Sequence, residues 1–409
     1  KSHTIHYGNL EYKKEIIDEV LVSIFKEPKS YTKENLVEIS SHGSTIIIKK
    51  IISATTDLGA RIADKGEFTF RSFLNGNMDL SQAEAVADLI SSKSENSHRI
   101  AINHIKGVFS DKIRGLRKEL INFSSLLELE LDFSEEDVEF ANREQLDNTL
   151  DEINNYCDIL IDSFRLNNVI KDGINVIILG KPNVGKSTIL NGLLNEEKAI
   201  ISEIPGTTRD IIEDTITIGG NLVRFIDTAG LRKTSDKIEK IGINKALKKS
   251  KEASIILYII DLNDTNLDSV ESELKTKYLN NKNVIIVGNK SDLKLDDEVV
   301  NYFSSKNHFT MSGINEKDIH KLNDLISDFI SKNLIREDSS IMINERHYSC
   351  LNKVKESIEN VKKNIANKSN TDLLAMDIKY ALNHLGEITG EITNDEILGN
   401  IFSKFCIGK

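Results

Sequence analysis

The chain has 409 residues, too many for one ordinary hydrophobic core, so two or three domains are expected. No apolar run approaches the roughly 20 residues of a membrane span, and a hydrophobic content of 39% favours a soluble protein. The net charge of -11 argues against a protein that coats nucleic acid through a broad basic face. Three scattered cysteines have no metal-binding spacing and indicate reduced thiols in a cytoplasm.

The first part of the chain, residues 1 to about 75, mixes strand-like and helix-like patterns, as in the alternating segment 36–39. A helical pattern then runs from Asp79 to about Asn168. Within it, one apolar stripe recurs at steps of three and four residues: Leu116, Leu120, Phe123, Leu127 and Leu131.

The middle of the chain, residues 173 to about 332, alternates short apolar strands with helices, which is typical of a doubly wound α/β sheet. The expected strands are 176–179, 223–226, 255–260 and 284–287. The helical pattern resumes after Asn333 and lasts almost to the end of the chain. We therefore predict an α/β nucleotide domain inserted into a helical domain whose halves, 79–168 and 333–409, pack together.

Residues 180–187 read GKPNVGKS and fit G-x-x-x-x-G-K-[ST], the loop that wraps a nucleotide's phosphates. A buried strand is expected before it and a helix after it, so backbone N–H groups and the helix dipole would form an anion site. Lys186 would reach the β- and γ-phosphates, and Ser187 would offer its hydroxyl to a magnesium ion.

The segment 289–292 reads NKSD and follows a predicted strand about a hundred residues later. The Asp292 carboxylate can accept hydrogen bonds from N1–H and the 2-amino group of guanine, which adenine cannot offer. Asn289 and Lys290 would brace the loop and the base. The segment 311–313 would close over the base. The predicted nucleotide is therefore GTP.

Two further segments match the switches of P-loop GTPases. Asp227 begins DTAG and would hold magnesium through water, and the Gly230 N–H would sense the γ-phosphate. Thr208, in PGTTRD at 205–210, is the predicted second magnesium ligand. Leu231 stands where Ras-type enzymes carry a water-orienting glutamine, so that group must come from elsewhere. The predicted GTP contacts are Asn183, Val184, Gly185, Lys186, Ser187, Thr188, Ser202, Glu203, Ile204, Pro205, Gly206, Thr207, Thr208, Asp227, Thr228, Ala229, Gly230, Asn289, Lys290 and Asp292.

The motifs GKPNVGKS, PGTTRD, DTAGLR and NKSD together resemble the TrmE–Era–Der class of bacterial GTPases. Within that class, the terminal CIGK and the segments 66–76, 79–85 and 387–391 resemble the MnmE (TrmE) family of tRNA-modifying GTPases. The resemblance spans the whole chain given. The chain begins at Lys1, and we expect the family's N-terminal few dozen residues to be missing from it.

This resemblance implies a fold of three parts: an α+β N-terminal domain related to folate-binding domains (1–76), a split all-α helical domain (77–172 and 333–409) and an inserted TrmE-type G domain (173–332). It also implies a cytoplasmic homodimer, formed through the N-terminal domains without a membrane, and a heterotetramer with the FAD-containing partner MnmG. The two proteins would add carboxymethylaminomethyl or aminomethyl groups to carbon 5 of the wobble uridine of certain tRNAs. The one-carbon unit would come from methylenetetrahydrofolate, with 5-formyltetrahydrofolate as an analogue, and glycine or ammonium would be the other donor.

The resemblance further implies a potassium ion in place of an arginine finger, bound in relatives by the P-loop asparagine and by oxygens of the first switch. The matching positions here are Asn183, Ser202, Ile204 and Thr207. A cation beside the phosphates would neutralise charge that develops in the transition state. The water-positioning glutamate of relatives matches Glu239, whose alternative interpretation is a solvated residue at a charged helix start.

For folate, the positions that match the relatives' contacts are Glu38, Asn77 and Lys409. Asn77 stands where relatives usually have lysine or arginine, so one charge contact to the cofactor's carboxylates would be missing. Cys406 lies near this chemistry by resemblance; it is either a nucleophile activated by the nearby lysine or a small packing residue in the tail. Cys157 and Cys350 are expected to be inert residues on helices.

Two alternative functions are considered beside tRNA modification. A ribosome-assembly GTPase of the Era or Der kind would carry a KH-type RNA-binding domain or a second G domain, but the sequence has no suitable G-x-x-G clamp and no second P-loop. A pure binding switch without turnover would need an external activating protein, and Asn183 and Glu239 argue against it.

Overall fold

The computed structural model describes residues 2–132, 142–201, 215–226, 253–263, 283–293, 297–306, 308–334, 341, 343–367, 371–403 and 405–408. The chain divides into two compact units. The first comprises Lys1–Ser91, Ala101–Ile161 and Ile343–Lys409, and the second comprises Ser92–Ile100 and Asp162–Met342. The finer division at residues 76, 172 and 332 stays a prediction.

The first unit begins with an antiparallel sheet in the order β1-β2-β3, made of β1 (Thr4–Tyr12), β2 (Glu15–Phe25) and β3 (Leu36–Ser40). A two-residue turn joins β1 to β2, and both of its residues have the positive φ that suits the twist of a hairpin. Helix α1 (Thr45–Asp57) contacts β2, and the Ser44 hydroxyl accepts the Ile46 N–H at its start. Helix α2 (Glu67–Leu74) follows, so the predicted mixture of strand and helix is confirmed.

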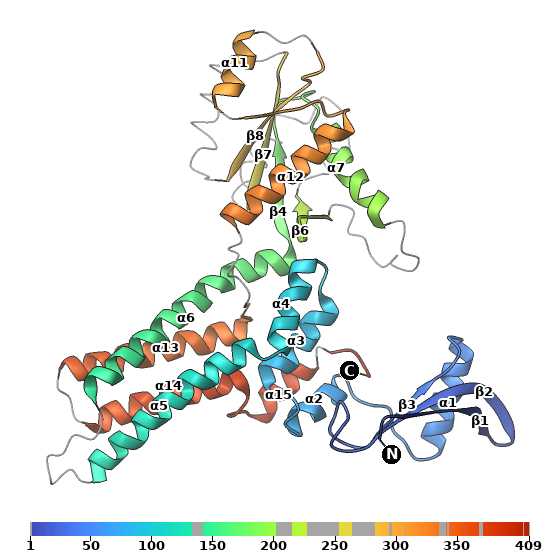
Figure 1. Ribbon diagram of the computed structural model, residues 1–409, viewed down its shortest axis with the longest axis vertical. Helices are drawn as coiled ribbons and strands as arrows, with labels where there is room; N and C mark the ends of the chain where they lie inside the picture. The colour runs from blue at the N-terminus through green and yellow to red at the C-terminus, as the bar shows by residue number, and fades with distance from the viewer. Residues whose placement is uncertain are drawn as a thin grey trace. The chain divides into compact units, whose positions relative to one another are not determined.

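The rest of the first unit is helical. Its elements are α3 (Leu80–Ser91), α5 (Val108–Asp132), α13 (Glu345–Ala366), α14 (Thr371–Thr389) and α15 (Asp395–Phe402). Two more helices, α4 (Glu95–Ile105) and α6 (Arg143–Asp172), have residues in both units. Helix α13 packs against α14 and α14 against α5, as Figure 1 shows, so the two halves of the helical domain meet as predicted.

The predicted apolar stripe of α5 is largely buried. Leu116, Leu120 and Leu127 are at most 2% exposed, whereas Phe123 and Leu131 are only half-buried. The stripe extends instead toward the start of the helix through other buried side chains: Phe109 and Ile113. The missed residues lie on the same face at helical spacing, and packing of α14 decides how far that face is covered.

The second unit contains a six-stranded sheet in the order β5-β6-β4-β7-β8-β9. Its strands are β4 (Ile174–Leu179), β5 (Thr215–Ile218), β6 (Asn221–Phe225), β7 (Ile255–Asp261), β8 (Val284–Asn289) and β9 (Phe309–Thr310). All neighbours are parallel except β5 and β6, which form an antiparallel hairpin at the edge. The α/β sheet is therefore confirmed, and the antiparallel edge strand β5 is an addition that the sequence pattern did not predict.

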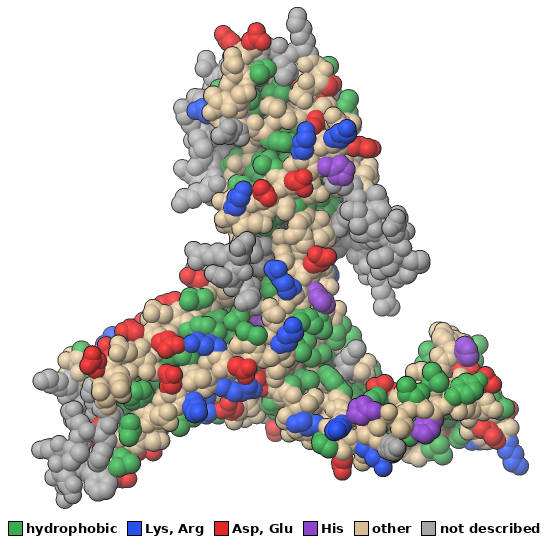
Figure 2. All heavy atoms as spheres, viewed as in Figure 1, with side chains coloured by type: hydrophobic (Ala, Val, Ile, Leu, Met, Phe, Trp, Pro, Cys, Tyr) green, Lys and Arg blue, Asp and Glu red, His purple; other side chains and the backbone are tan. Residues whose placement is uncertain are grey.

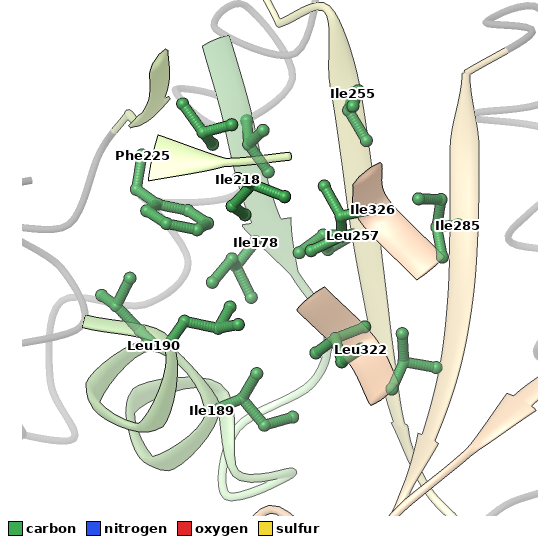
Figure 3. Close-up of a cluster of buried hydrophobic side chains, with 14 of the residues drawn as sticks. Ile178, Ile189, Leu190, Ile218, Phe225, Ile255, Leu257, Ile285, Leu322 and Ile326 are labelled. Atoms are coloured by element: carbon green, nitrogen blue, oxygen red, sulfur yellow. The ribbon is translucent and has the colours of Figure 1, made fainter. Parts of the chain in front are cut away.

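Helices cover the faces of this sheet because its strands are apolar on both sides. Ile178 points into a cluster with residues of α7 (Lys186–Ile201) and α12 (Glu316–Asn333), which Figure 3 shows. Its neighbour Ile177 belongs to a separate cluster that contains Phe303 of α11 (Asp297–Ser305). Successive residues of a strand point to opposite faces of the sheet, so a continuous apolar strand is buried on both faces. Among the described residues, no helix combines the length and the apolar character that crossing a bilayer requires.

Candidate nucleotide-binding site

The P-loop connects the end of β4 to the start of α7, and two of its glycines are required by close backbone and side-chain approaches. Gly180 has φ +147°, and a Cβ there would lie 2.2 Å from the Ile259 carbonyl oxygen of β7. Gly185 has φ +98°, and a Cβ there would lie 2.2 Å from Asn289 Nδ2. Any larger residue would clash at both positions, so the motif's glycines have a direct steric cause.

The loop curls around the ammonium group of Lys186. Its Nζ donates to the carbonyl oxygens of Gly180 at 2.8 Å and Lys181 at 2.6 Å. Asn183 has φ +61°, a left-handed conformation that asparagine tolerates better than most residues with a side chain. Ser187 lies beside Lys186 in the first turn of α7, where the helix dipole favours anions.

Asn289 joins three parts of the site. It ends β8 and is 3% exposed; its Nδ2 donates to the Val184 carbonyl of the P-loop at 2.7 Å. Its Oδ1 accepts the Gly313 N–H at 2.8 Å, from the segment predicted to close over the base. One buried amide therefore fixes the phosphate loop and the base-recognition loops relative to each other, which agrees with the predicted bracing role.

Lys290 is held by a residue that the sequence analysis missed. Its Nζ lies 2.6 Å from Oδ2 of Asp261, the last residue of β7. Burial opposes ionisation of Asp261, but the hydrogen bond from Lys290 outweighs it and lowers the pKa of that carboxyl. Asn263 adds a hydrogen bond from Nδ2 to the Lys290 carbonyl at 3.1 Å. The sequence did offer a signal for Asp261, because it ends the strand next to β8 and the carboxyl ends of parallel strands lie at the same edge of a sheet.

Asp292 is exposed, and its carboxylate is oriented by the neighbouring segment. The Ser312 hydroxyl donates to Asp292 Oδ1 at 2.6 Å. The Ser312 N–H in turn donates to Oδ2 of Asp318 at 3.1 Å, from the first turn of α12. Ser312 lies in the segment 311–313 that was predicted to close over the base, and its hydrogen bond to Asp292 agrees with that prediction. Asp318, which holds Ser312, was not singled out from the sequence.

The other predicted contacts to GTP, magnesium and potassium lie outside the described residues and stay predictions: Ser202, Glu203, Ile204, Pro205, Gly206, Thr207, Thr208, Asp227, Thr228, Ala229, Gly230 and Glu239. Of the predicted folate contacts, Lys409 also lies outside them, and Glu38 is exposed on β3. Asn77 donates from Nδ2 to the Tyr31 carbonyl at 3.0 Å and to the Ser72 hydroxyl at 3.2 Å. Its amide nitrogen therefore fastens the chain locally.

The C-terminal tail is docked on the segment that precedes α2. The Gly66 N–H donates to the Cys406 carbonyl at 3.3 Å, and Lys65 and Ile407 form an antiparallel bridge. Phe405 is 4% exposed and packs in an apolar cluster with Phe402. The tail thus has a defined position next to the N-terminal part of the chain.

The three cysteines differ in environment. Cys157 and Cys350 are buried on α6 and α13, and burial raises the pKa of their thiols to about 12 and about 11. Cys406 is exposed. All three are free thiols, and the two buried ones are held in the unreactive protonated form, as expected.

A glycine-rich loop between strand and helix, bridged by a buried asparagine to an N-K-x-D segment, defines a P-loop nucleotide-binding protein of the GTPase class. Two family models match the chain: "GTP-binding protein TrmE N-terminus" over residues 1–77 and "MnmE helical domain" over residues 80–406. The chain belongs to the MnmE family of tRNA modification GTPases. This confirms the family resemblance, the predicted fold class and the GTPase class that were inferred from the motifs.

Relatives named "tRNA modification GTPase MnmE" match the chain along its length. The protein from Flavobacterium psychrophilum is 49% identical over 414 residues, covering 100% of this chain and 90% of the relative. The protein from Cytophaga hutchinsonii is 48% identical, covering 100% of this chain and 89% of the relative. That from Bacteroides thetaiotaomicron is 43% identical, covering 100% and 90%.

Proposed function

We propose that this protein hydrolyses GTP to GDP and phosphate with the help of potassium, and that hydrolysis serves the modification of carbon 5 of the wobble uridine of certain tRNAs. The observation that carries the nucleotide part is the Asn289 bridge between the P-loop and the base-recognition segment. The tRNA part rests on the name that the relatives carry.

In this proposal the described residues bind and orient the nucleotide. Lys186 exchanges its loop carbonyls for phosphate oxygens, and Asp292 accepts the guanine N–H groups with its orientation set by Ser312. Ser187 suits magnesium because its hydroxyl is a hard oxygen donor beside the phosphate-binding lysine, and Thr208 would be its partner ligand. Magnesium when bound would neutralise phosphate charge.

Potassium dependence is proposed from the resemblance to the MnmE family, in which a monovalent cation takes the place of an arginine finger. Leu231 cannot orient a water molecule, and we assign that role to Glu239. Asn183 in the P-loop would offer its side-chain oxygen to the monovalent cation, together with Ser202, Ile204 and Thr207. The exposed left-handed position of Asn183 supports this assignment, because its side chain is not used in the core.

The potassium proposal is tested by exchanging sodium for potassium at constant ionic strength. GTP hydrolysis should rise many-fold in potassium, and Asn183→Ala should abolish the rise. Asn191→Ala, the same change on the exposed face of α7, is the matched control and should leave the rise intact. Equal rates in the two salts for the unaltered protein would refute the cation assignment.

The assembly part of the proposal is a homodimer through the N-terminal region that joins the FAD-containing partner MnmG in a heterotetramer. Its support is one exposed apolar face of the N-terminal sheet, which carries Ile5 and Tyr7 of β1 and Leu21 of β2. Figure 2 shows apolar side chains on the surface of this part of the chain, which Figure 1 labels β1, β2 and β3 in the same view. Single apolar residues on a surface are normal, but clustered ones mark interaction sites. On that face, Ile5 is 68%, Tyr7 72% and Leu21 46% exposed.

The one-carbon chemistry is proposed to use methylenetetrahydrofolate held by Glu38, Asn77 and Lys409. Glu38 fits a pterin ring, because an exposed carboxylate can accept its N–H groups. Asn77 fits less well, because its amide nitrogen already donates to Tyr31 and Ser72. The folate when bound would supply the one-carbon unit. For Cys406, an exposed thiol in the docked tail, both the nucleophilic and the packing role stay open.

The modification is tested by mass spectrometry of tRNA from cells that lack the protein. Unmodified wobble uridines are expected, and they should return when the intact gene is supplied but not when Lys186→Ala is supplied. Intact wobble uridines would refute the main function. Accumulated ribosomal RNA precursors with normal tRNA would favour the ribosome-assembly alternative. The cytoplasmic location stays a prediction.

A further inference from the structure

Asn96, at the start of α4, is bonded twice to the hairpin that β5 and β6 form at the sheet edge. Its side-chain Nδ2 donates to Asn221 Oδ1 at 2.7 Å, and its backbone N–H donates to the Gly220 carbonyl at 3.1 Å. Both partners lie in the second compact unit, although Asn96 belongs in sequence to the helical region. A residue that binds a neighbouring element through backbone and side chain together fixes both its position and its orientation.

The tip of this hairpin is held firmly from the other side as well. Gly219 and Gly220 have φ values of +55° and +75°, as a tight two-residue turn requires. A Cβ on Gly219 would lie 2.0 Å from the Ser327 hydroxyl of α12, so the turn is wedged against that helix. Asn221 is 3% exposed and closes the turn through Nδ2 to the Gly219 carbonyl at 3.2 Å. The tip is therefore packed against α12 and closed by its own hydrogen bond.

The hairpin also lies between the two predicted nucleotide-sensing segments in sequence. β5 starts at Thr215, a few residues after Thr208 of the first switch, and β6 ends at Phe225, just before Asp227. Each strand of the hairpin is therefore continuous in the chain with one of the two predicted nucleotide-sensing segments.

The far end of α4 is tied into the buried network of the helical domain. The Ile105 carbonyl accepts Gln82 Nε2 at 2.8 Å. The His104 ring stacks on Phe109 with centroids 5.3 Å apart, and Phe109 lies 5.2 Å from His347. His347 is bonded to Glu84 at 2.9 Å. Helix α4 thus has hydrogen-bonded partners at both ends, one set in each compact unit.

We propose that Asn96 and Asn221 are positioning residues that couple the nucleotide state of the G domain to the helical domain through α4. The inference rests on the proposed GTPase function and adds to it the element that carries the signal. Packed elements respond in discrete steps rather than by gradual deformation, so a hydrogen-bonded contact between hairpin and helix can transmit a small displacement. Spatial continuity alone does not establish coupling, and therefore the test measures coupling directly.

The experiment compares amide hydrogen exchange of the peptide 101–109 in GDP and in GDP with aluminium fluoride, in potassium buffer, on the full chain. The unaltered protein should show a nucleotide-dependent difference. In Asn96→Ala this difference should shrink about fivefold or more, the lower end of usual coupling factors, while GTP hydrolysis stays within about twofold. Asn352→Ala, an exposed asparagine bonded only within α13, is the matched control and should behave as the unaltered protein.

Two further variants separate coupling from stability. Asn221→Asp keeps the oxygen that accepts from Asn96 but loses the donor to the Gly219 carbonyl, so it should retain the exchange difference at a lower melting temperature. Asn96→Asp opposes two acceptors and should lose the exchange difference. A purely structural role would lower melting temperature and hydrolysis together in both. An exchange difference that persists in Asn96→Ala and Asn96→Asp overturns the inference. Absence of GTP hydrolysis in the unaltered protein would instead overturn the proposed function.

Discussion

A buried ionic network links the two halves of the helical domain, and replacing Arg346 tests how much it contributes. The Arg346 guanidinium donates to Glu84 of α3 at 2.9 Å and 2.8 Å. It also donates to the Glu387 and Ile388 carbonyls, where α14 ends, at 2.5 Å and 3.0 Å. Burial opposes ionisation of Glu84, but His347 and Arg346 outweigh it and hold the pKa of Glu84 well below its usual range. Arg346→Met leaves a buried carboxylate without its main partner.

Breaking a buried ion pair in this way costs about 3–5 kcal/mol. For a folding unit of this size, that corresponds to a fall in melting temperature of roughly 6–20 °C. Calorimetry with and without GDP shows which unfolding transition belongs to the helical unit, because bound GDP raises the melting temperature of the G domain, which holds it. Lys379→Met, which removes a surface ion pair with Glu128 between α14 and α5, is the matched control and should cost at most about 1 kcal/mol. Equal, small shifts in the two variants would refute the reasoning.

Three more outcomes are expected. Asp292→Asn should weaken GTP binding roughly 100-fold or more, measured with a fluorescent nucleotide, and improve binding of xanthosine triphosphate, whose C2 oxygen suits an amide donor; unchanged base preference would contradict the guanine assignment. Burial lowers the pKa of His347, so the unfolded chain binds more protons below pH 6.5. Stability should therefore fall as pH drops below 6.5, by at most about 1.4 kcal/mol per pH unit for this group. The free energy of unfolding, measured in urea at several pH values, should fall less steeply with decreasing pH in His347→Gln; an equally steep fall would count against it. A thiol reagent at pH 8 should modify Cys406 rapidly and the two buried cysteines only on unfolding; three fast thiols would contradict the burial.

Local patterns predicted much of the fold. The strand at 174–179 and the helix after it were recognisable because a continuous apolar run precedes a glycine-rich motif. The edge strand β5 was missed because its four residues are too few to show a period, and its antiparallel pairing depends on the Gly219-Gly220 turn. The extent of the α5 stripe was misjudged because coverage by α14 is a property of packing.

For the site, the motifs predicted residue types and chemistry but not the contacts that orient them. Lys186, Asn289 and Asp292 were identified by spacing alone. Asp261, which holds Lys290, belongs to no predicted motif. Ser312 lies in the predicted segment 311–313, but its contact with Asp292 was not predicted, because only the shared edge of the sheet brings the two residues together.

The sequence by itself determined the nucleotide, the family and the order of the domains, because these depend on short motifs, each made of residues that are close together in the chain. The tertiary structure decided which residues far apart in the sequence contact each other. Asn289 meets Val184 across 105 residues, Asn96 meets Asn221 across 125, and Arg346 meets Glu84 across 262. No local period encodes such pairs, because they form only when strands share an edge or helices pack, and the geometry of packing sets the partner.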